Sequence, residues 1–115
     1  LKPFICRTVL MYLMRYNPQE FEIKQTEQYS RWFDSLRDRV VRAKIDIRIR
    51  RLSLGNLGDA KSVRDGVCEL RINFGPGYRV YFVHRGSKIV LLLAGGDKSS
   101  QSRDIAIALK LVKLL

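Results

Sequence analysis

The chain has 115 residues, which suits one domain with a real hydrophobic core and leaves no room for two. Hydrophobic residues make up 46% of it, a share that excludes an intrinsically disordered protein. The net charge of +11 would attract a polyanion, an acidic protein or an anionic membrane, and nucleic acid is the commonest partner of a compact basic domain.

Cysteine usage and hydropathy limit the class of protein further. Cys6 and Cys68 form no CxxC pair, and with one histidine the soft ligands are too few for a zinc site. We therefore predict reduced thiols in a cytoplasmic protein without metal or other cofactor, with a single disulfide as the alternative. No run reaches the ~20 apolar residues of a membrane span, so no membrane partner is expected.

The N-terminal residues are expected to lie outside the domain. The first residue is Leu1, and Met14 is a candidate for the true start of translation. We therefore predict that residues 1–19 are an N-terminal extension and that residues 20–115 form the folded domain.

The first half of the domain predicts one strand and two helices. Residues 21–24 alternate between apolar and polar side chains, as in a short strand. Thr26 is a suitable N-cap for a helix that follows it and breaks near Asp38. Residues 39–53 fit both the strand and the helix pattern, but this segment is long for a strand, and we predict a second helix. Glycines in residues 55–59 end it in a loop.

The second half predicts a meander and a final helix. Three strands are predicted in succession, at residues 68–74, 78–84 and 88–94. The last of them carries an uninterrupted apolar run, as expected for a strand that is covered on both faces. Ser99 or Ser100 caps a final helix. Its buried stripe comprises Ile105, Leu109 and Val112. The pattern predicts an α+β domain with a mostly antiparallel sheet of about four strands and helices on one face.

The turn at residues 75–77 fixes how the first two strands of the meander pair. A three-residue loop places Phe74 opposite Tyr78, and Leu70 then faces Phe82. In this register the apolar side chains gather on one face, and a slip of one residue would put charges in the core. The other face is predicted to carry three charged side chains: Glu69, Arg71 and Arg79.

This charged face, with Lys98 at its end, offers the groups that RNA cleavage requires. The 2′-hydroxyl needs a base, the phosphate needs hydrogen-bond donors, and the leaving oxygen needs a proton. Arginine suits the phosphate because its planar fork matches two oxygens. Tyr78 or Tyr81 would stack on a base, and no metal is required.

A bland interpretation stands beside this one. Charged residues on a sheet face are more often a solvated salt-bridge ladder than a catalytic site. Arg48 and Arg51 of the second helix are likewise first a solvated face and only second an RNA-binding track.

Two segments of the sequence favour the RNA-cleavage site over the solvated salt-bridge ladder. Residues 69–82, with the sequence ELRINFGPGYRVYF, and residues 91–101, LLLAGGDKSSQ, resemble the RelE/HigB superfamily of toxin–antitoxin killer proteins. The similarity is closest to the phage-related addiction module killer branch and extends over about residues 20–115. It implies a RelE-like α+β fold with two N-terminal helices and a C-terminal helix.

The resemblance also implies a function. Such a protein is the toxin of a type II toxin–antitoxin module, an endoribonuclease that cleaves mRNA at the ribosome by metal-independent 2′-hydroxyl attack and so inhibits translation. A cognate antitoxin, here a helix-turn-helix protein like HigA, would neutralise it. Contact with operator DNA would be made only through the toxin–antitoxin complex.

Site residues follow from the resemblance by position. Arg79 matches the arginine that holds the scissile phosphate, Arg71 a basic strand residue of the active site, and Lys98 a basic residue after the last strand. Glu69 stands where RelE has a lysine, and Asp104 where it has a tyrosine. Glu69 is therefore expected either to act as the base or to orient Arg79, and Lys98 to stabilise the leaving oxygen.

Two other functions stay open. The ParE branch shares the fold but inhibits DNA gyrase without nuclease activity, and it would cause DNA damage rather than mRNA cleavage. An inactive basic module would bind nucleic acid with an affinity that falls with salt, and it would cause no growth arrest.

Overall fold

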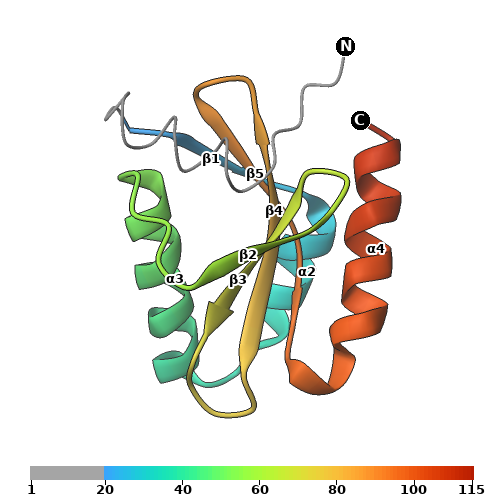
Figure 1. Ribbon diagram of the computed structural model, residues 1–115. Helices are drawn as coiled ribbons and strands as arrows, with labels where there is room; N and C mark the ends of the chain where they lie inside the picture. Colours follow the sequence, from blue (N-terminus) through green and yellow to red (C-terminus); the bar gives the residue numbers. More distant parts are fainter. Residues whose placement is uncertain (1–19) are drawn as a thin grey trace.

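Five strands form one sheet in the computed structural model, which describes residues 20–115 (Figure 1). The strands are β1 (Glu22–Gln25), β2 (Ala60–Arg64), β3 (Val67–Ile72), β4 (Tyr78–Arg85) and β5 (Ile89–Gly96). They lie in the order β1-β5-β4-β3-β2, so β4 is the central strand. β1 runs parallel to β5, and the other neighbours are antiparallel. The predicted α+β class is confirmed, with a mixed sheet of five strands in place of about four.

The helices begin and end close to the predicted positions. They are α2 (Glu27–Ser35), α3 (Arg39–Ser53) and α4 (Gln101–Lys113), and a short 3-10 turn, η1 (Lys98–Ser100), precedes the last. The Thr26 hydroxyl accepts a hydrogen bond from the backbone N–H of Tyr29 at 3.1 Å, as an N-cap should. Asp38 caps α3 in the same way by accepting from the Val40 N–H at 2.8 Å. The ambiguous segment is therefore a helix.

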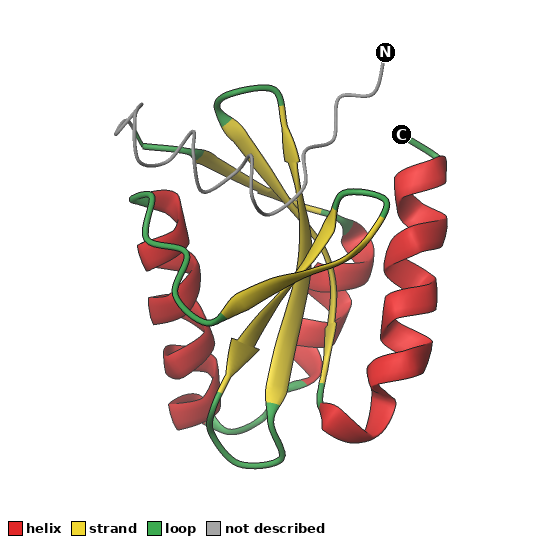
Figure 2. Ribbon diagram, in the orientation of Figure 1, coloured by secondary structure: helices red, strands yellow, loops and turns green. Residues whose placement is uncertain are grey.

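Helices cover both faces of the sheet (Figure 2). On one face, α2 and α3 bury side chains such as Tyr29 and Ile45 against Leu70 and Phe82. On the other face, α4 packs on a second apolar cluster. That cluster includes Val67, Tyr81, Val83, Leu93, Leu109 and Val112. The prediction that helices pack on one face is wrong, because the predicted polar face also carries apolar side chains that need cover.

The pairing of β3 with β4 differs from the prediction by two residues. Arg71 lies opposite Arg79, and Glu69 lies opposite Tyr81. The connecting loop spans residues 73–77 rather than 75–77, and it contains two glycines with φ of +56° and +80°. Because strand side chains alternate with period two, a shift of two residues leaves each one on its predicted face.

β2 was not predicted. It is an edge strand in which Ala60 alone is buried, so its sequence lacks the apolar alternation that marks a half-buried strand. It pairs antiparallel with β3 and brings Lys61 opposite Glu69. This missed strand therefore contributes to the surroundings of a predicted site residue.

A bulge interrupts the pairing of β4 with β5. Phe82 pairs with Leu92 and Tyr81 pairs with Ala94, which leaves Leu93 as an extra residue. Beyond the bulge, Gly95 meets the Trp32 ring and Gly96 meets the Asp104 carboxylate so closely that neither position has room for a Cβ atom. The two glycines thus allow α2 and α4 to approach β5 from opposite faces.

The predictions about the cysteines and the N-terminal residues fall mostly outside the part of the chain that the structure describes. Cys68 is buried within the core. Cys6, the candidate start at Met14 and the predicted extension at residues 1–19 lie outside the described residues. Within residues 20–115, no helix is both long and apolar enough to cross a membrane.

Candidate functional site

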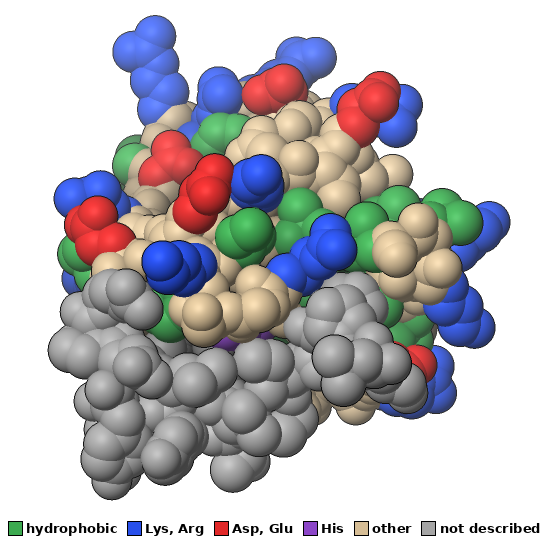
Figure 3. Space-filling view, turned by 90° about the horizontal axis from the view of Figure 1, so that it is seen from above, with side chains coloured by type: hydrophobic (Ala, Val, Ile, Leu, Met, Phe, Trp, Pro, Cys, Tyr) green, Lys and Arg blue, Asp and Glu red, His purple; other side chains and the backbone are tan. Residues whose placement is uncertain are grey.

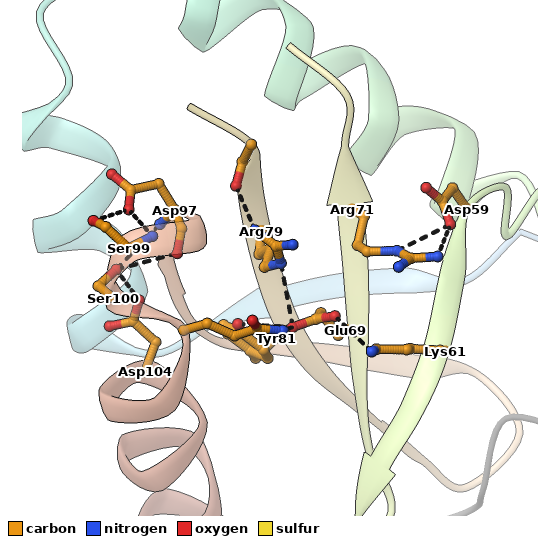
Figure 4. Close-up of polar contacts among 12 residues, drawn as sticks. Asp59, Lys61, Glu69, Arg71, Arg79, Tyr81, Asp97, Ser99, Ser100 and Asp104 are labelled. Atoms are coloured by element: carbon orange, nitrogen blue, oxygen red, sulfur yellow. Dashed lines mark hydrogen bonds and ion pairs between the residues drawn. The ribbon is translucent and has the colours of Figure 1, made fainter. Parts of the chain in front are cut away.

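A pocket of about 300 Å³ opens beside the loop that joins β3 to β4. Arg71 and Arg79 lie directly opposite each other on these strands, and both line the pocket (Figure 4). Its full lining is Asp59, Arg71, Ile72, Asn73, Gly77, Tyr78 and Arg79. Two guanidinium groups at one small pocket form a site for an anion with several oxygens, such as a phosphate. This site is named the arginine pocket below.

Asp59 holds Arg71 in place. Its Oδ1 accepts hydrogen bonds from Nη2 of Arg71 at 2.8 Å and from Nε at 3.2 Å. The side chains are 42% exposed for Arg71 and 51% for Asp59, so both are accessible to a ligand. Sequence patterns did not single out Asp59, because it lies in a loop and meets Arg71 only after β2 and β3 have paired.

Arg79 is held more firmly than Arg71. Its Nη1 donates to the backbone carbonyl of Gly77 at 2.8 Å, and its Nε lies 3.5 Å from Oε2 of Glu69. The side chain is only 13% exposed. Contacts at both ends of the guanidinium group therefore fix the direction in which its remaining N–H groups point.

Glu69 lies beneath this pair and is completely buried. Its Oε2 accepts hydrogen bonds from the Tyr81 hydroxyl at 2.9 Å and from Nε2 of Gln101 at 2.8 Å. Nζ of Lys61 lies 3.8 Å from Oε1 (Figure 4). The carboxylate thus connects four elements, namely β2, β3, β4 and α4. These contacts favour the interpretation that Glu69 orients Arg79 and weaken the one in which it takes a proton from a substrate.

Tyr81 cannot stack on an RNA base in this arrangement. Its side chain is fully buried, and burial together with the hydrogen bond to Glu69 raises the pKa of the hydroxyl far above its usual range. The hydroxyl therefore stays protonated and serves as a donor to Glu69. Tyr78, the other aromatic residue predicted to stack, is half-buried and lines the arginine pocket.

Lys98 lies in η1, beside the β3–β4 loop that borders the arginine pocket. Its backbone N–H donates to the carbonyl of Pro76 at 3.4 Å, which attaches η1 to the β3–β4 loop. At Gly77, a Cβ atom would lie 3.4 Å from Nη1 of Arg79 and 3.6 Å from Cβ of Lys98. Gly77, which lines the pocket, therefore lies between Arg79 and the start of the exposed Lys98 side chain.

The two arginines of α3 that were predicted to bind RNA differ in their surroundings. Arg48 donates to the backbone carbonyls of Arg71 and Asp59, and burial lowers the pKa of its guanidinium group. It joins α3 to the strands that carry the arginine pocket. Arg51 is exposed and lines a second pocket together with Lys44.

Positive charge is not confined to this end of the molecule. Figure 3 views the end opposite to the β3–β4 loop and shows lysine and arginine side chains spread among acidic ones. His84, the single histidine, is buried in β4 against the Phe21 ring, with 5.1 Å between ring centroids. It is away from the arginine pocket, and burial lowers its pKa. The pairing of the arginines, rather than net charge, thus marks the site.

Asp97 caps η1, the 3-10 turn that leads into α4. Its Oδ1 accepts from the N–H of Ser99 at 2.8 Å, while Ser100 directs its hydroxyl to Asp104. Ser100, one of the two predicted serines, is the N-cap residue of α4, but its hydroxyl makes no capping hydrogen bond to that helix. It instead accepts from the backbone N–H of Asp97 at 3.2 Å, in a capping box at η1. Burial raises the pKa of Asp104, which shares this cluster.

The Asp97 cap leads to a pH-dependent prediction. The Ser99 hydroxyl and backbone bonds hold the pKa of Asp97 below its usual value of 3.8. A carboxyl whose pKa is lower in the folded state stabilises the fold above 3.8, and this contribution is lost as the pH falls through the lowered pKa. We expect Asp97→Ala to cost about 1 kcal/mol of unfolding free energy at pH 7. Urea unfolding should show a smaller difference in unfolding free energy between wild type and Asp97→Ala near pH 3 than at pH 7. A difference that stays constant with pH would contradict this role.

Comparison with known proteins places these residues in a family. Residues 31–113 match a family described as phage-derived and Gp49-like (DUF891). The chain is also 50% identical over 84 residues to an uncharacterized protein of Haemophilus influenzae. These aligned residues cover 73% of this chain and 85% of that protein. No solved structure matches the present chain. The family match includes all residues of the arginine pocket.

Proposed function

Because the chain belongs to the phage-derived, Gp49-like family, which is related to addiction module killer proteins, we propose that it is the toxin of a toxin–antitoxin module and cleaves mRNA. One observation carries the choice of RNA as the target. Arg71 and Arg79 are cross-strand partners on β3 and β4, and both line a single pocket that also holds an accessible carboxylate, Asp59.

The chemistry is an internal transfer at one phosphate. The 2′-oxygen attacks the neighbouring phosphorus, a 2′,3′-cyclic phosphate forms, and the bond to the 5′-oxygen of the next nucleotide breaks. Arg71 and Arg79 bind the non-bridging oxygens, whose negative charge increases in the transition state. The Lys98 ammonium group stabilises the leaving 5′-oxygen, which takes up a proton from solvent water. Glu69 acts by holding Arg79, from beneath the pocket.

Asp59 is assigned the role of base. Glu69 is fully buried, whereas Asp59 is half-exposed and lines the same pocket as both arginines. Its carboxylate would receive the proton of the 2′-hydroxyl while keeping its contact with Arg71.

Asp59→Asn tests this assignment. The amide oxygen keeps an acceptor for Arg71 but is no longer basic, so we expect cleavage to slow about 100-fold with RNA binding retained. Single-turnover cleavage of a labelled RNA measures the rate, and Asp65→Asn, in the exposed turn between β2 and β3, is the control. Cleavage by Asp59→Asn at the rate of the unchanged protein would remove Asp59 from the mechanism.

The proposed function itself is tested by induction in bacterial cells. We expect growth and translation to stop, with new mRNA 5′ ends that appear with the wild-type chain and not with Arg79→Ala. Co-expression of a neighbouring helix-turn-helix protein as antitoxin should restore growth. DNA damage and filamentation without mRNA cleavage would point to gyrase inhibition instead, and normal growth would point to an inactive nucleic-acid-binding module. Purified protein with mRNA, with and without ribosomes, then shows whether cleavage needs the ribosome.

A further inference from the structure

A second pocket, of about 260 Å³, lies between α3 and the start of the β3–β4 loop. It is lined by Lys44, Ile47, Arg48, Arg51, Ile72, Asn73 and Phe74, and is named the helix pocket below. Three of these side chains are cationic and none is acidic. The helix that provides them is itself strongly basic, with one acidic residue, Asp46, along its length. The charge of the pocket therefore suits an anionic ligand.

The helix pocket also offers apolar contact. Ile47 is 50% exposed and presents its aliphatic side chain to the pocket that it lines. The Phe74 ring is half-buried and has the Lys44 ammonium group 4.7 Å from its centroid. Cationic groups beside exposed apolar and aromatic side chains are what proteins use for single-stranded nucleic acid, where phosphates and base faces are bound together.

The two pockets adjoin each other. Ile72 and Asn73 line both of them. Arg48 also connects them, because it lines the helix pocket while its guanidinium group donates to the backbone carbonyls of Arg71 and Asp59. A ligand that leaves the arginine pocket past Asn73 therefore enters the helix pocket directly. Asp59 is the one acidic residue among those that line the two pockets.

We propose that the helix pocket binds the nucleotide adjacent to the scissile phosphate of a single-stranded RNA, with its phosphate on Lys44 and Arg51 and its base against Ile47 and Phe74. This inference rests on the proposed function, because the arginine pocket holds the scissile phosphate in it. Arg48 keeps the two pockets in fixed relation and is a positioning residue.

An unpaired strand fits these pockets better than a duplex. Each pocket has the volume for part of a nucleotide rather than for a helix, and the base must leave its stack to reach Phe74. Duplex RNA is recognised mainly by shape across its wide minor groove, which a pair of small adjoining pockets does not match.

The test compares a short and a longer RNA on the full chain. Both probes are 2′-O-methylated so that they cannot be cleaved. One is a dinucleotide, whose single internucleotide phosphate occupies the arginine pocket, and the other is a single-stranded hexanucleotide, which also supplies the neighbouring phosphate for the helix pocket. Fluorescence anisotropy over a range of salt concentrations measures the affinity. Lys44→Ala/Arg51→Ala should weaken hexanucleotide binding about tenfold and lower the slope of log Kd against log salt by about 0.7, because one phosphate of the probe is no longer neutralised. Dinucleotide binding should stay within about twofold.

Two further variants separate the contributions. Phe74→Leu should weaken hexanucleotide binding about fivefold without changing the salt slope, because it removes an aromatic ring that faces the base and no charge. Lys110→Ala/Lys113→Ala removes two cations from α4, outside both pockets, and should leave both probes unaffected.

Each outcome decides something different. If neither probe binds to the wild-type chain, the proposed function fails and the inference fails with it. If both probes bind and Arg79→Ala abolishes binding of both, but Lys44→Ala/Arg51→Ala keeps wild-type affinity and slope for the hexanucleotide, the inference is overturned and the function stands. The inference is also overturned if a duplex competes as well as the single strand, or if the double variant binds an oligoglutamate peptide more weakly and RNA as tightly as before.

Discussion

Replacement of Arg79 by lysine should lower the rate of RNA cleavage about 1,000-fold, the largest effect expected of any conservative substitution in this chain. A lysine keeps the positive charge beside Glu69 but has no planar fork that could bind two phosphate oxygens. All N–H groups of a lysine lie on one nitrogen, whereas Arg79 donates to the Gly77 carbonyl through Nη1 and has further N–H groups on its other nitrogens. Single-turnover cleavage of labelled RNA measures the effect.

Arg85→Lys is the matched control, because Arg85 is the exposed last residue of the same strand, β4. It should cleave RNA at the wild-type rate. The free energy of unfolding of Arg79→Lys should lie within about 1.5 kcal/mol of the wild-type value, since the buried carboxylate keeps a cationic neighbour. Unchanged cleavage by Arg79→Lys would show that the guanidinium group is not a phosphate ligand.

Replacement of Glu69 by alanine should cost about 3–5 kcal/mol of unfolding free energy. The substitution leaves Arg79, the Tyr81 hydroxyl and Gln101 facing a cavity without their common acceptor. A domain of this size is stable by only about 5–15 kcal/mol, so the loss should be plain in urea or thermal unfolding. Glu69→Gln retains an acceptor oxygen and should cost less, about 1–3 kcal/mol.

Glu22→Ala in β1 provides the control, because this glutamate is exposed and should change stability by no more than about 0.5 kcal/mol. Glu69→Gln also distinguishes orientation from proton transfer. If it folds and cleaves more slowly at every pH with an unchanged pH profile, Glu69 acts through Arg79. Wild-type stability of Glu69→Ala would contradict the network described here.

Local patterns predicted most of the secondary structure, and they did so where one side of an element is apolar. The cap at Thr26 and the fifteen residues of α3 follow from such signals. Asp38 was predicted only as the end of the first helix, and the structure shows it to be the N-cap of α3. β2 carried none, because an exposed edge strand needs no apolar alternation. The strand register was missed for a different reason: side-chain alternation repeats every two residues and cannot distinguish registers that differ by two.

The residues of the candidate site could mostly be predicted from the sequence, but the burial of Glu69 could not. Alternation placed Glu69, Arg71 and Arg79 on one face, and the structure puts all three there. That α4 would cover this face and bury Glu69 depends on tertiary packing, which no pattern within β3 or β4 contains. Asp59 was missed because its contact with Arg71 joins a loop to a strand twelve residues later.

The bulge in β5 bears on how relatives of this chain can vary in length. Leu93 is surplus to the pairing, since Tyr81 pairs with Ala94 and Phe82 with Leu92. A natural deletion of Leu93 would restore regular pairing between β4 and β5. Gly95 would stay opposite Val80 and Gly96 opposite Arg79, and each glycine would still face the helix that it faces now. A deletion one step later, at Ala94, would instead bring Leu93 opposite Tyr81 and keep the same downstream pairs. Family members that are shorter by one residue are therefore expected to have lost it here, between Leu92 and the glycine pair, and not within the pair itself.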